Sequence, residues 1–382
     1  MKSDPGRQAR EGIGELYRRC FGAAPALRGW APGRINLIGE HTDHQHGWAL
    51  PTPTPLGVHV AAGPGEEGLL RAVSREQEGI EAIELSAPGP RGGWADLLGG
   101  LLLALTEDSG PPPGKGVDVA IAGDLPLGAG LSSSAALSVA AIPLIMRLLW
   151  RDRPPVPPSG LPQIARRGEA LGLGVPCGIL DPYVAVHGRE GQALLLDCGR
   201  GRHRTVPLGL DGVEPPLRLA VIDSGARRRL ADGRYGRLLE LCSAAARALG
   251  RPLRGLPPED LDGRREELSA AQYRHALHVI EESRRTREAA AALEEGNFRR
   301  FGELLGASHR SLKENLRATC PATDAIVDAL EEVDGVLGAR QVGGGWGGAV
   351  LLLGTGDGVD EAQARAQTAG GEGTRPVLLL TI

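Results

Sequence analysis

The stretch GDLPLGAGLSSSAALSVAA, residues 123–141, decides how the rest of the chain is read. An apolar run at residues 117–121 precedes it and predicts a strand, and the serines open a run of small residues that predicts a helix. Glycines in the intervening turn let backbone N–H groups face inward, and the serines are expected to cap the helix. Because a helix N-terminus carries partial positive charge, the stretch predicts an anion-binding loop.

Phosphate binding and a purely connecting turn are both open interpretations of this loop. It lacks the lysine of G-x-x-x-x-G-K-[ST], so it is not a Walker A motif. Ser133 stands where a dinucleotide fingerprint has its third glycine, and no acidic residue ends a strand about 20 residues later. The serines favour phosphate, since a hydroxyl at such a helix end can also bind Mg²⁺.

The bulk composition is that of an ordinary globular chain of about two domains. Its 382 residues are 41% hydrophobic and 24% charged, and the net charge of −4 excludes a global basic surface for nucleic acid or an anionic membrane. The five cysteines include no C-x-x-C pair, which predicts free thiols rather than a disulfide or zinc framework. With no secretory signal or bilayer-length apolar run, we expect a cytoplasmic protein, monomeric or weakly homo-oligomeric, without nucleic-acid or membrane partners.

Helical and strand patterns alternate in two halves, and the second half is richer in helices. The polar stretch at residues 198–204 is the best candidate for a domain boundary. It divides the chain into an N-terminal domain at 1–204 and a C-terminal domain at 205–382. On a charged helix of the second half, His275 and His278 are expected to lie at the surface rather than to bind a ligand.

A dense polar cluster, Glu40-His41-Thr42-Asp43-His44-Gln45-His46, follows a short apolar run. Metal binding is one interpretation, although adjacent ligands rarely converge on one ion without helical spacing. Sugar recognition is a second, because vicinal hydroxyls require paired donors and acceptors on a rigid turn. A solvated loop is the third.

Three further charged residues have chemistry suited to phosphoryl transfer. Glu169 and Asp181 flank a turn, so one carboxylate could hold Mg²⁺ while the other accepts a proton from an attacking hydroxyl. Arg34 follows a Pro-Gly turn, and a guanidinium suits the charge of a transferring phosphoryl group. Taken singly, each also fits a structural role such as a helix cap or a solvated face.

Together these segments resemble the GHMP small-molecule kinases and, among them, the galactokinases. Residues 32–43, PGRINLIGEHTD, look like the galactokinase signature. Residues 126–135, PLGAGLSSSA, are similar to the superfamily's ATP loop, and residues 343–348, GGGWGG, resemble its third motif. The motifs occur in the family's order, and the likeness covers essentially the whole chain.

The resemblance implies an α+β, two-domain GHMP kinase fold. It has a mixed-sheet N-terminal domain, a ferredoxin-like C-terminal domain and the active site in the interdomain cleft. It also implies ATP-dependent, Mg²⁺-requiring phosphorylation of the anomeric hydroxyl of D-galactose, giving α-D-galactose 1-phosphate.

The resemblance assigns a role to each motif residue. Asp181 would be the catalytic base, and Arg34 would stabilise the transition state and keep that carboxylate charged. Ser134 and Glu169 would bind Mg²⁺. The ATP phosphates would contact Gly128, Ala129, Gly130, Leu131, Ser132, Ser133 and Ser134, and the sugar would contact Glu40, His41, Thr42, Asp43, Gly178 and Tyr235.

Several positions depart from the galactokinase pattern. His44 stands where Tyr is usual, Pro182-Tyr183 where Gln with an aromatic or apolar residue is common, and Trp346 where Phe is usual; residues 223–229 lack the usual Asn. A kinase for a related sugar such as N-acetylgalactosamine, arabinose or galacturonate therefore stays open. A non-catalytic galactose and ATP sensor, or a scaffold with an inert glycine-rich turn, is the alternative from another class.

Overall fold

The computed structural model describes residues 5–112, 114–125, 130–174, 178–210, 213–227, 233–371 and 373–380. The chain divides into two compact units. Unit 1 comprises Met1–Arg34, Pro53–Leu125 and Ser132–Gly188, and unit 2 comprises Ile35–Thr52, Pro126–Leu131 and Arg189–Ile382.

Unit 1 is built on a mixed five-stranded sheet in the order β1-β3-β6-β4-β5. Strand β6 is parallel to β4 and antiparallel to β3, and β4 is antiparallel to β5. β6 is the predicted strand before the serine-rich helix, and its residues are buried up to its last position. The strands are β1 (Leu27–Asn36), β3 (Pro51–Gly65), β4 (Leu69–Ser74), β5 (Ile80–Glu84) and β6 (Gly116–Gly123).

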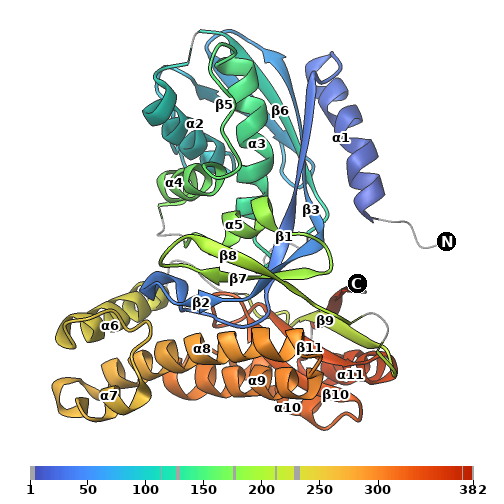
Figure 1. The fold of residues 1–382 in the computed structure, drawn as a ribbon. Coiled ribbons are helices and arrows are strands. Elements are labelled where there is room, and N and C mark those ends of the chain that lie inside the picture. Colours follow the sequence, from blue (N-terminus) through green and yellow to red (C-terminus); the bar gives the residue numbers. More distant parts are fainter. Residues whose placement is uncertain are drawn as a thin grey trace. The chain divides into compact units, whose positions relative to one another are not determined.

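Helices lie on both sides of this sheet. The apolar side of α1 (Pro5–Phe21) packs on Ala120 and Ala122 of β6. The other helices, α2 (Asp96–Ser109), α3 (Ser133–Leu149), α4 (Leu161–Leu173) and α5 (Leu180–His187), gather on the opposite side, as Figure 1 shows. Gly100 of α2 approaches α4 so closely that a Cβ there would lie 2.1 Å from the carbonyl oxygen of Gly168. Helix α3, whose N-terminus follows the predicted anion-binding loop, packs against both α4 and α2.

Unit 2 contains two antiparallel sheets. A three-stranded sheet has the order β2-β7-β8, and a four-stranded sheet the order β10-β11-β9-β12. The strands are β2 (Trp48–Ala49), β7 (Gln192–Asp197), β8 (Arg202–Pro207), β9 (Leu217–Asp223), β10 (Val336–Val342), β11 (Ala349–Thr355) and β12 (Arg375–Leu380). Helices α10 (Pro321–Glu331) and α11 (Gly356–Ala369) pack against the four-stranded sheet. The order β9, helices, β10, β11, α11, β12 is the ferredoxin-like arrangement, so the predicted fold class is confirmed.

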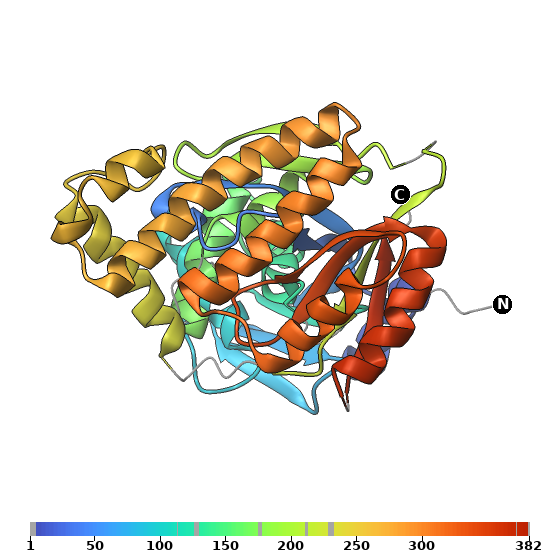
Figure 2. The same cartoon turned by 90° about the horizontal axis from the view of Figure 1, so that it is seen from below.

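Unit 2 also contains helices α6 (Arg234–Ala248), α7 (Pro258–Asp262), α8 (Ala270–Glu294) and α9 (Phe298–Ser311). Helix α8 begins with a capping box of Ser269 and Gln272, and it runs beside α9 (Figure 2). Both His275 and His278 on α8 are buried. The prediction that they lie at the surface is wrong, because neighbouring segments cover the side of α8 that carries them.

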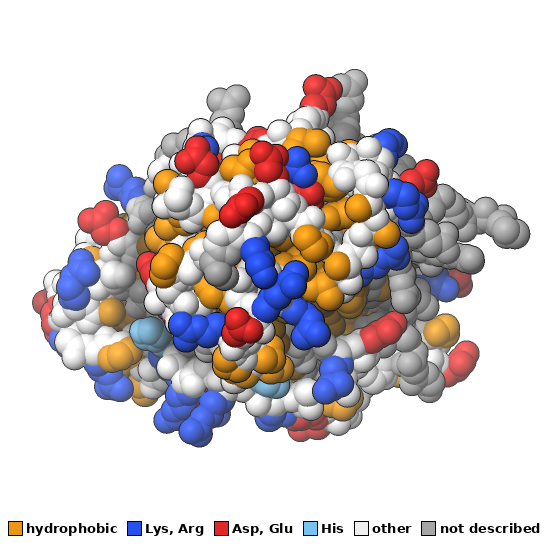
Figure 3. Space-filling model, turned by 90° about the horizontal axis from the view of Figure 1, so that it is seen from above, with side chains coloured by type: hydrophobic (Ala, Val, Ile, Leu, Met, Phe, Trp, Pro, Cys, Tyr) orange, Lys and Arg blue, Asp and Glu red, His pale blue; other side chains and the backbone are white. Residues whose placement is uncertain are grey.

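Three remaining sequence features have structural counterparts. Cys20, Cys198, Cys242 and Cys320 are free, as predicted, and Cys177 lies outside the described residues. Strand β8 begins within residues 198–204 and pairs with β7; the domain division at residue 204 stays a prediction. Acidic, basic and hydrophobic side chains are interspersed on the face shown in Figure 3.

Across the described part of the chain, no helix combines the length and the apolar character needed to cross a membrane.

Candidate active site

An arginine and an aspartate from distant parts of the sequence meet in unit 1. Arg34 donates from Nε to Oδ1 of Asp181 at 2.7 Å and from Nη2 to Oδ2 at 2.9 Å. Asp181 lies in the first turn of α5, where a helix favours a carboxylate, and Ser132 Oγ donates to its Oδ2. The Asp181 side chain stays 30% exposed. The carboxylate is therefore held from two sides and still accessible to a substrate hydroxyl.

A hydroxyl and a second carboxylate also meet in unit 1. Ser134, in the first turn of α3, donates from Oγ to Oε1 of Glu169 on α4 at 2.5 Å. Both are hard oxygen donors of the kind Mg²⁺ prefers, and Mg²⁺ on a nucleotide usually takes only one or two protein ligands beside phosphate and water. The pair fits that ion. Among the described residues, no three His, Cys, Asp or Glu side chains gather as a metal site.

Ser132 differs from the prediction that it caps the helix. It is the N-cap residue of α3, but its side chain makes no capping hydrogen bond. An N-cap normally has extended backbone, whereas Ser132 is left-handed with φ 62°. Its hydroxyl instead contacts Asp181.

Left-handed backbone at non-glycine residues marks all three motifs. Within the described ranges such residues are His41, His46, Ser132, Arg317 and Trp346. His41 lies in the signature-like segment, Ser132 in the serine-rich loop and Trp346 in the third glycine-rich motif. This conformation costs on the order of 1–3 kcal/mol, and strained residues cluster at functional sites. The strain supports a functional role for these segments.

The end of the signature-like segment, residues 40–43, is compact and largely buried in unit 2. Glu40, His41 and Thr42 are buried, and Asp43 begins a short 3₁₀ turn. The His41 ring lies 5.9 Å, centroid to centroid, from the ring of Tyr235 on α6. The structure thus brings the signature and Tyr235 together.

The third motif contacts the same segment. The backbone N–H of Gly343 donates to Oε1 of Glu40 at 2.8 Å, and Arg340 Nη2 lies 3.5 Å from that oxygen. A Cβ at Gly343 would lie 3.9 Å from the backbone of Gly130, which has φ 76°. Glycine suits both positions of this close approach.

The predicted residues therefore fall into two groups. Unit 1 holds Arg34, Ser132, Ser133, Ser134, Glu169, Gly178 and Asp181, and unit 2 holds Glu40, His41, Thr42, Asp43, Gly130, Leu131 and Tyr235. Gly128 and Ala129 lie outside the described residues.

Sequence reasoning missed three buried residues around Glu40. Glu282 accepts from the backbone N–H of Gly39 at 3.0 Å, and His278 Nε2 lies 3.0 Å from the Glu40 carbonyl oxygen. Burial lowers the pKa of His278 to about 4, whereas Arg285 lowers the pKa of Glu282 to about 2 against the effect of its burial. The third is Arg340, a charge amid the apolar residues of β10. A charge inside an apolar strand is the signal that could have identified it, since buried charges are normally paired.

Next to the signature, His44 is also kept neutral. Burial, aided by the nearby His278, His275 and His46, lowers the pKa of His44 to about 4. Neither ring nitrogen of His44 has a hydrogen-bond partner among the described residues.

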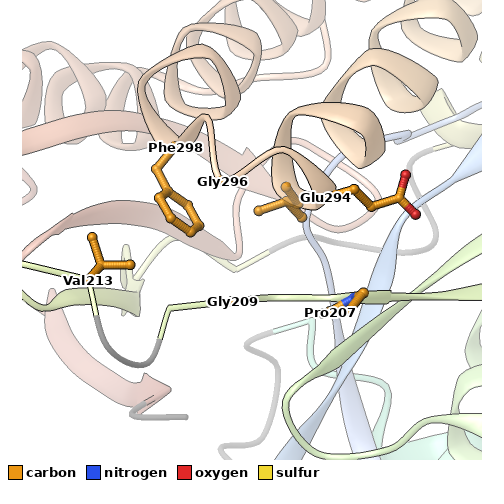
Figure 4. Close-up of a pocket in the computed structure, with 7 residues that line it drawn as sticks. Pro207, Gly209, Val213, Glu294, Gly296 and Phe298 are labelled. Carbon is orange, nitrogen blue, oxygen red and sulfur yellow. The ribbon is translucent and has the colours of Figure 1, made fainter.

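A separate pocket in unit 2 contains none of the predicted positions. It is lined by Pro207, Gly209, Val213, Leu293, Glu294, Gly296 and Phe298 (Figure 4). The Glu294 carboxylate points away from Phe298 and Val213 in that view and pairs with Arg204. Its mostly apolar lining makes it a poor match for phosphoryl transfer.

Comparisons with known proteins identify the family to which these motifs belong. Residues 15–64 match the galactokinase galactose-binding signature, residues 96–189 the GHMP kinase N-terminal domain and residues 289–372 the GHMP kinase C-terminal domain. The galactokinase of Homo sapiens is 36% identical over 351 residues, covering 88% of this chain and 86% of that protein. The galactokinase of Thermotoga maritima is 37% identical over 324 residues, covering 85% and 88%.

A solved structure agrees with these matches. Lactococcus lactis galactokinase complexed with galactose superposes with a TM-score of 0.87 at 28% identity, covering 94% of each chain. The chain belongs to the galactokinase family of GHMP kinases.

Proposed function

We propose that this chain transfers the γ-phosphoryl group of ATP to the anomeric hydroxyl of D-galactose, giving α-D-galactose 1-phosphate and ADP. The observation that carries the proposal is the Asp181 carboxylate, held through both oxygens by Arg34 and contacted by Ser132. Family membership and the galactose-bound relative support the choice of sugar.

Asp181 acts as the base in this proposal. The anomeric oxygen attacks the γ-phosphorus, its proton passes to Asp181, and the bond between phosphorus and the β,γ-bridging oxygen breaks to release ADP. Arg34 fixes the carboxylate in one orientation and supplies positive charge beside the reacting oxygens, where phosphoryl charge develops. A positioned base is worth ~10²–10⁴-fold in rate.

The loop residues bind ATP in the same proposal. The backbone around Gly130 and Ser132, followed by the N-terminus of α3, offers N–H groups to the phosphates. Ser134 and Glu169 would hold Mg²⁺, which when bound neutralises charge on the transferring phosphates. Glu40, His41, Asp43 and Tyr235 are proposed to bind the sugar, supported by the burial and ring contact of this group.

We also place the enzyme in the cytoplasm. ATP as co-substrate and the free state of Cys20, Cys198, Cys242 and Cys320 support this location.

An ADP-release assay across a panel of sugars tests the function. The panel contains galactose, N-acetylgalactosamine, arabinose and galacturonate, with a no-sugar control. Turnover highest with galactose is expected. Turnover only with another sugar would assign the chain to that sugar, and galactose binding without turnover would identify a sensor.

The departure at His44 is the specific reason for including the other sugars. This partly buried imidazole lies beside the signature, at a position where family members usually carry Tyr. The neighbourhood of the sugar-binding residues is therefore altered in size and polarity.

A further inference from the structure

We propose that Arg340 is a positioning residue for sugar binding that acts through Glu40. The inference rests on the proposed function, because Glu40 is there a sugar-binding residue. Arg340 lies in β10 three residues before Gly343, and its side chain is fully buried at 0% exposure.

The contacts of Arg340 converge on the segment that carries Glu40. Nη1 donates to the carbonyl oxygens of Leu37 at 2.9 Å and Asn36 at 3.2 Å. Nη2 lies 3.5 Å from Oε1 of Glu40, which also accepts from Gly343 at 2.8 Å. One guanidinium therefore links the backbone leading into Glu40 with its carboxylate.

These contacts orient the carboxylate. Among the described residues, Oε1 is the Glu40 oxygen that accepts a hydrogen bond from the protein. With Oε1 held by the fold, Oε2 is directed to a second partner. A sugar hydroxyl is a donor of the right kind, and a charge-assisted hydrogen bond to it is about twice as strong as a neutral one.

The backbone of the same segment is fixed from α8 as well. Glu282 accepts from Gly39, and it is itself bound by Ser308 at 2.5 Å and Arg285 at 2.8 Å. The neutral ring of His278 donates from Nε2 to the Glu40 carbonyl, which can only accept. Arg340 is thus the member of this set that reaches both the backbone and the carboxylate of the sugar-binding segment.

Lysine cannot reproduce this arrangement. A planar guanidinium presents donors in a fixed fork, whereas an ammonium is a single point charge on a flexible stem. Arg340→Lys keeps the charge but gives up part of the set of contacts to Asn36, Leu37 and Glu40. Losing one charge-assisted hydrogen bond should weaken galactose binding roughly tenfold or more.

The test compares Arg340→Lys with wild type and with Arg300→Lys. Arg300 lies on α9, where it pairs with Glu288 and Glu303 near the surface, so it is a matched control. Galactose Kd is measured by calorimetry without ATP, and KM for each substrate, kcat and Tm are measured separately. We expect Arg340→Lys to raise the galactose Kd and KM roughly tenfold, with KM for ATP within about twofold, and Arg300→Lys to match wild type.

A double-mutant cycle tests the route through Glu40. If Arg340 acts through that carboxylate, Arg340→Lys should raise the galactose Kd far less in a Glu40→Gln background than in wild type. Additive effects would contradict the proposal.

Other outcomes also decide the question. Arg340→Gln removes the cation beside the Glu40 carboxylate and serves as a second variant if Arg340→Lys is unstable. An unchanged galactose Kd in a folded variant, an equal rise in KM for ATP, or failure of both variants to fold would each overturn the positioning role. Wild-type chain that binds galactose but releases no ADP would instead refute the proposed function, and the galactose Kd would still test Arg340.

Discussion

Replacing Asp181 by Asn should abolish most turnover while leaving galactose binding in place. Asn keeps the shape of the side chain and one carbonyl oxygen for Arg34, but it cannot accept a proton from a sugar hydroxyl. The wild-type carboxylate uses both oxygens, at 2.7 and 2.9 Å from Arg34, so the substitution also breaks one side of a bidentate pair.

The expected effect of Asp181→Asn on kcat, through the base role, and on stability, through the bond to Arg34, can be estimated separately. Loss of a positioned base lowers kcat by ~10²–10⁴-fold, equivalent to about 3–5 kcal/mol in the barrier. Loss of one charge-assisted hydrogen bond lowers the free energy of unfolding by about 1–3 kcal/mol. If the Arg34–Asp181 pair were only structural, Asp181→Asn would lower the free energy of unfolding and leave kcat nearly unchanged. A large fall in kcat therefore identifies the base role.

The chain provides a matched control in the same unit. Arg71 donates from Nε to Oδ1 of Asp118 at 2.8 Å and from Nη2 to Oδ2 at 2.7 Å. This pair joins β4 to β6, and neither residue is a predicted site position. Asp118→Asn should lower Tm to a similar degree as Asp181→Asn and leave kcat nearly unchanged.

The assay is ADP release at saturating galactose and ATP, with galactose Kd from calorimetry and Tm from thermal unfolding. A kcat for Asp181→Asn within about threefold of wild type would exclude the base role, since it is far below the effect of general-base catalysis. A comparable loss of kcat in Asp118→Asn would show that the rate reports folding rather than chemistry.

Three further predictions concern the same groups. Ser132→Ala removes the hydroxyl donor to Asp181 and should lower kcat about tenfold, less than Asp181→Asn, in the same assay. Glu169→Gln weakens the proposed Mg²⁺ pair, so a Mg²⁺ titration at fixed ATP should show a half-saturating concentration raised roughly tenfold or more; an unchanged titration would remove Glu169 from that role. Burial lowers the pKa of His278 from 6.5 to about 4, so the unfolded chain binds the extra proton between these values and stability is lost as the pH falls from about 6.5 to 4. Denaturant unfolding should show this loss, up to roughly 3 kcal/mol from His278. His278→Gln should remove that share and leave the part that comes from His44 and His309, whose pKa values burial also lowers to about 4.

The elements on either side of the serine-rich loop could be predicted from local patterns, whereas the fold class came from the resemblance to a known family. The run before the serine loop forms β6 and the small-residue run forms α3, because strand alternation and helix-forming residues are local properties. Strand β8 was harder to recognise, since its sequence RHRTVP is mostly exposed and carries little hydrophobic pattern. Its position is determined by pairing with β7, which lies outside the segment itself.

The candidate site was predictable where its motifs resemble those of a known family. Arg34 and Asp181 are 147 residues apart, and their types and motif positions indicated their pairing before the geometry was known. The capping role of Ser132 was wrong because the left-handed backbone of that residue depends on its surroundings.

The buried residues that hold the segment around Glu40 could not be predicted in the same way. His278 and Glu40 are separated by 238 residues, and the partner atom is a backbone carbonyl that no side-chain pattern encodes. Charged residues around His278 on α8 resemble those of a solvated helix, so its burial follows only from tertiary packing.

The most direct test of the account is the identity of the reaction product. Purified chain incubated with galactose, ATP and Mg²⁺ is followed by ³¹P and ¹H NMR. The account predicts galactose-dependent ADP and a phosphate on the anomeric carbon in the α configuration. Absence of a galactose-dependent product, or a phosphate on any other carbon of the sugar, would contradict it.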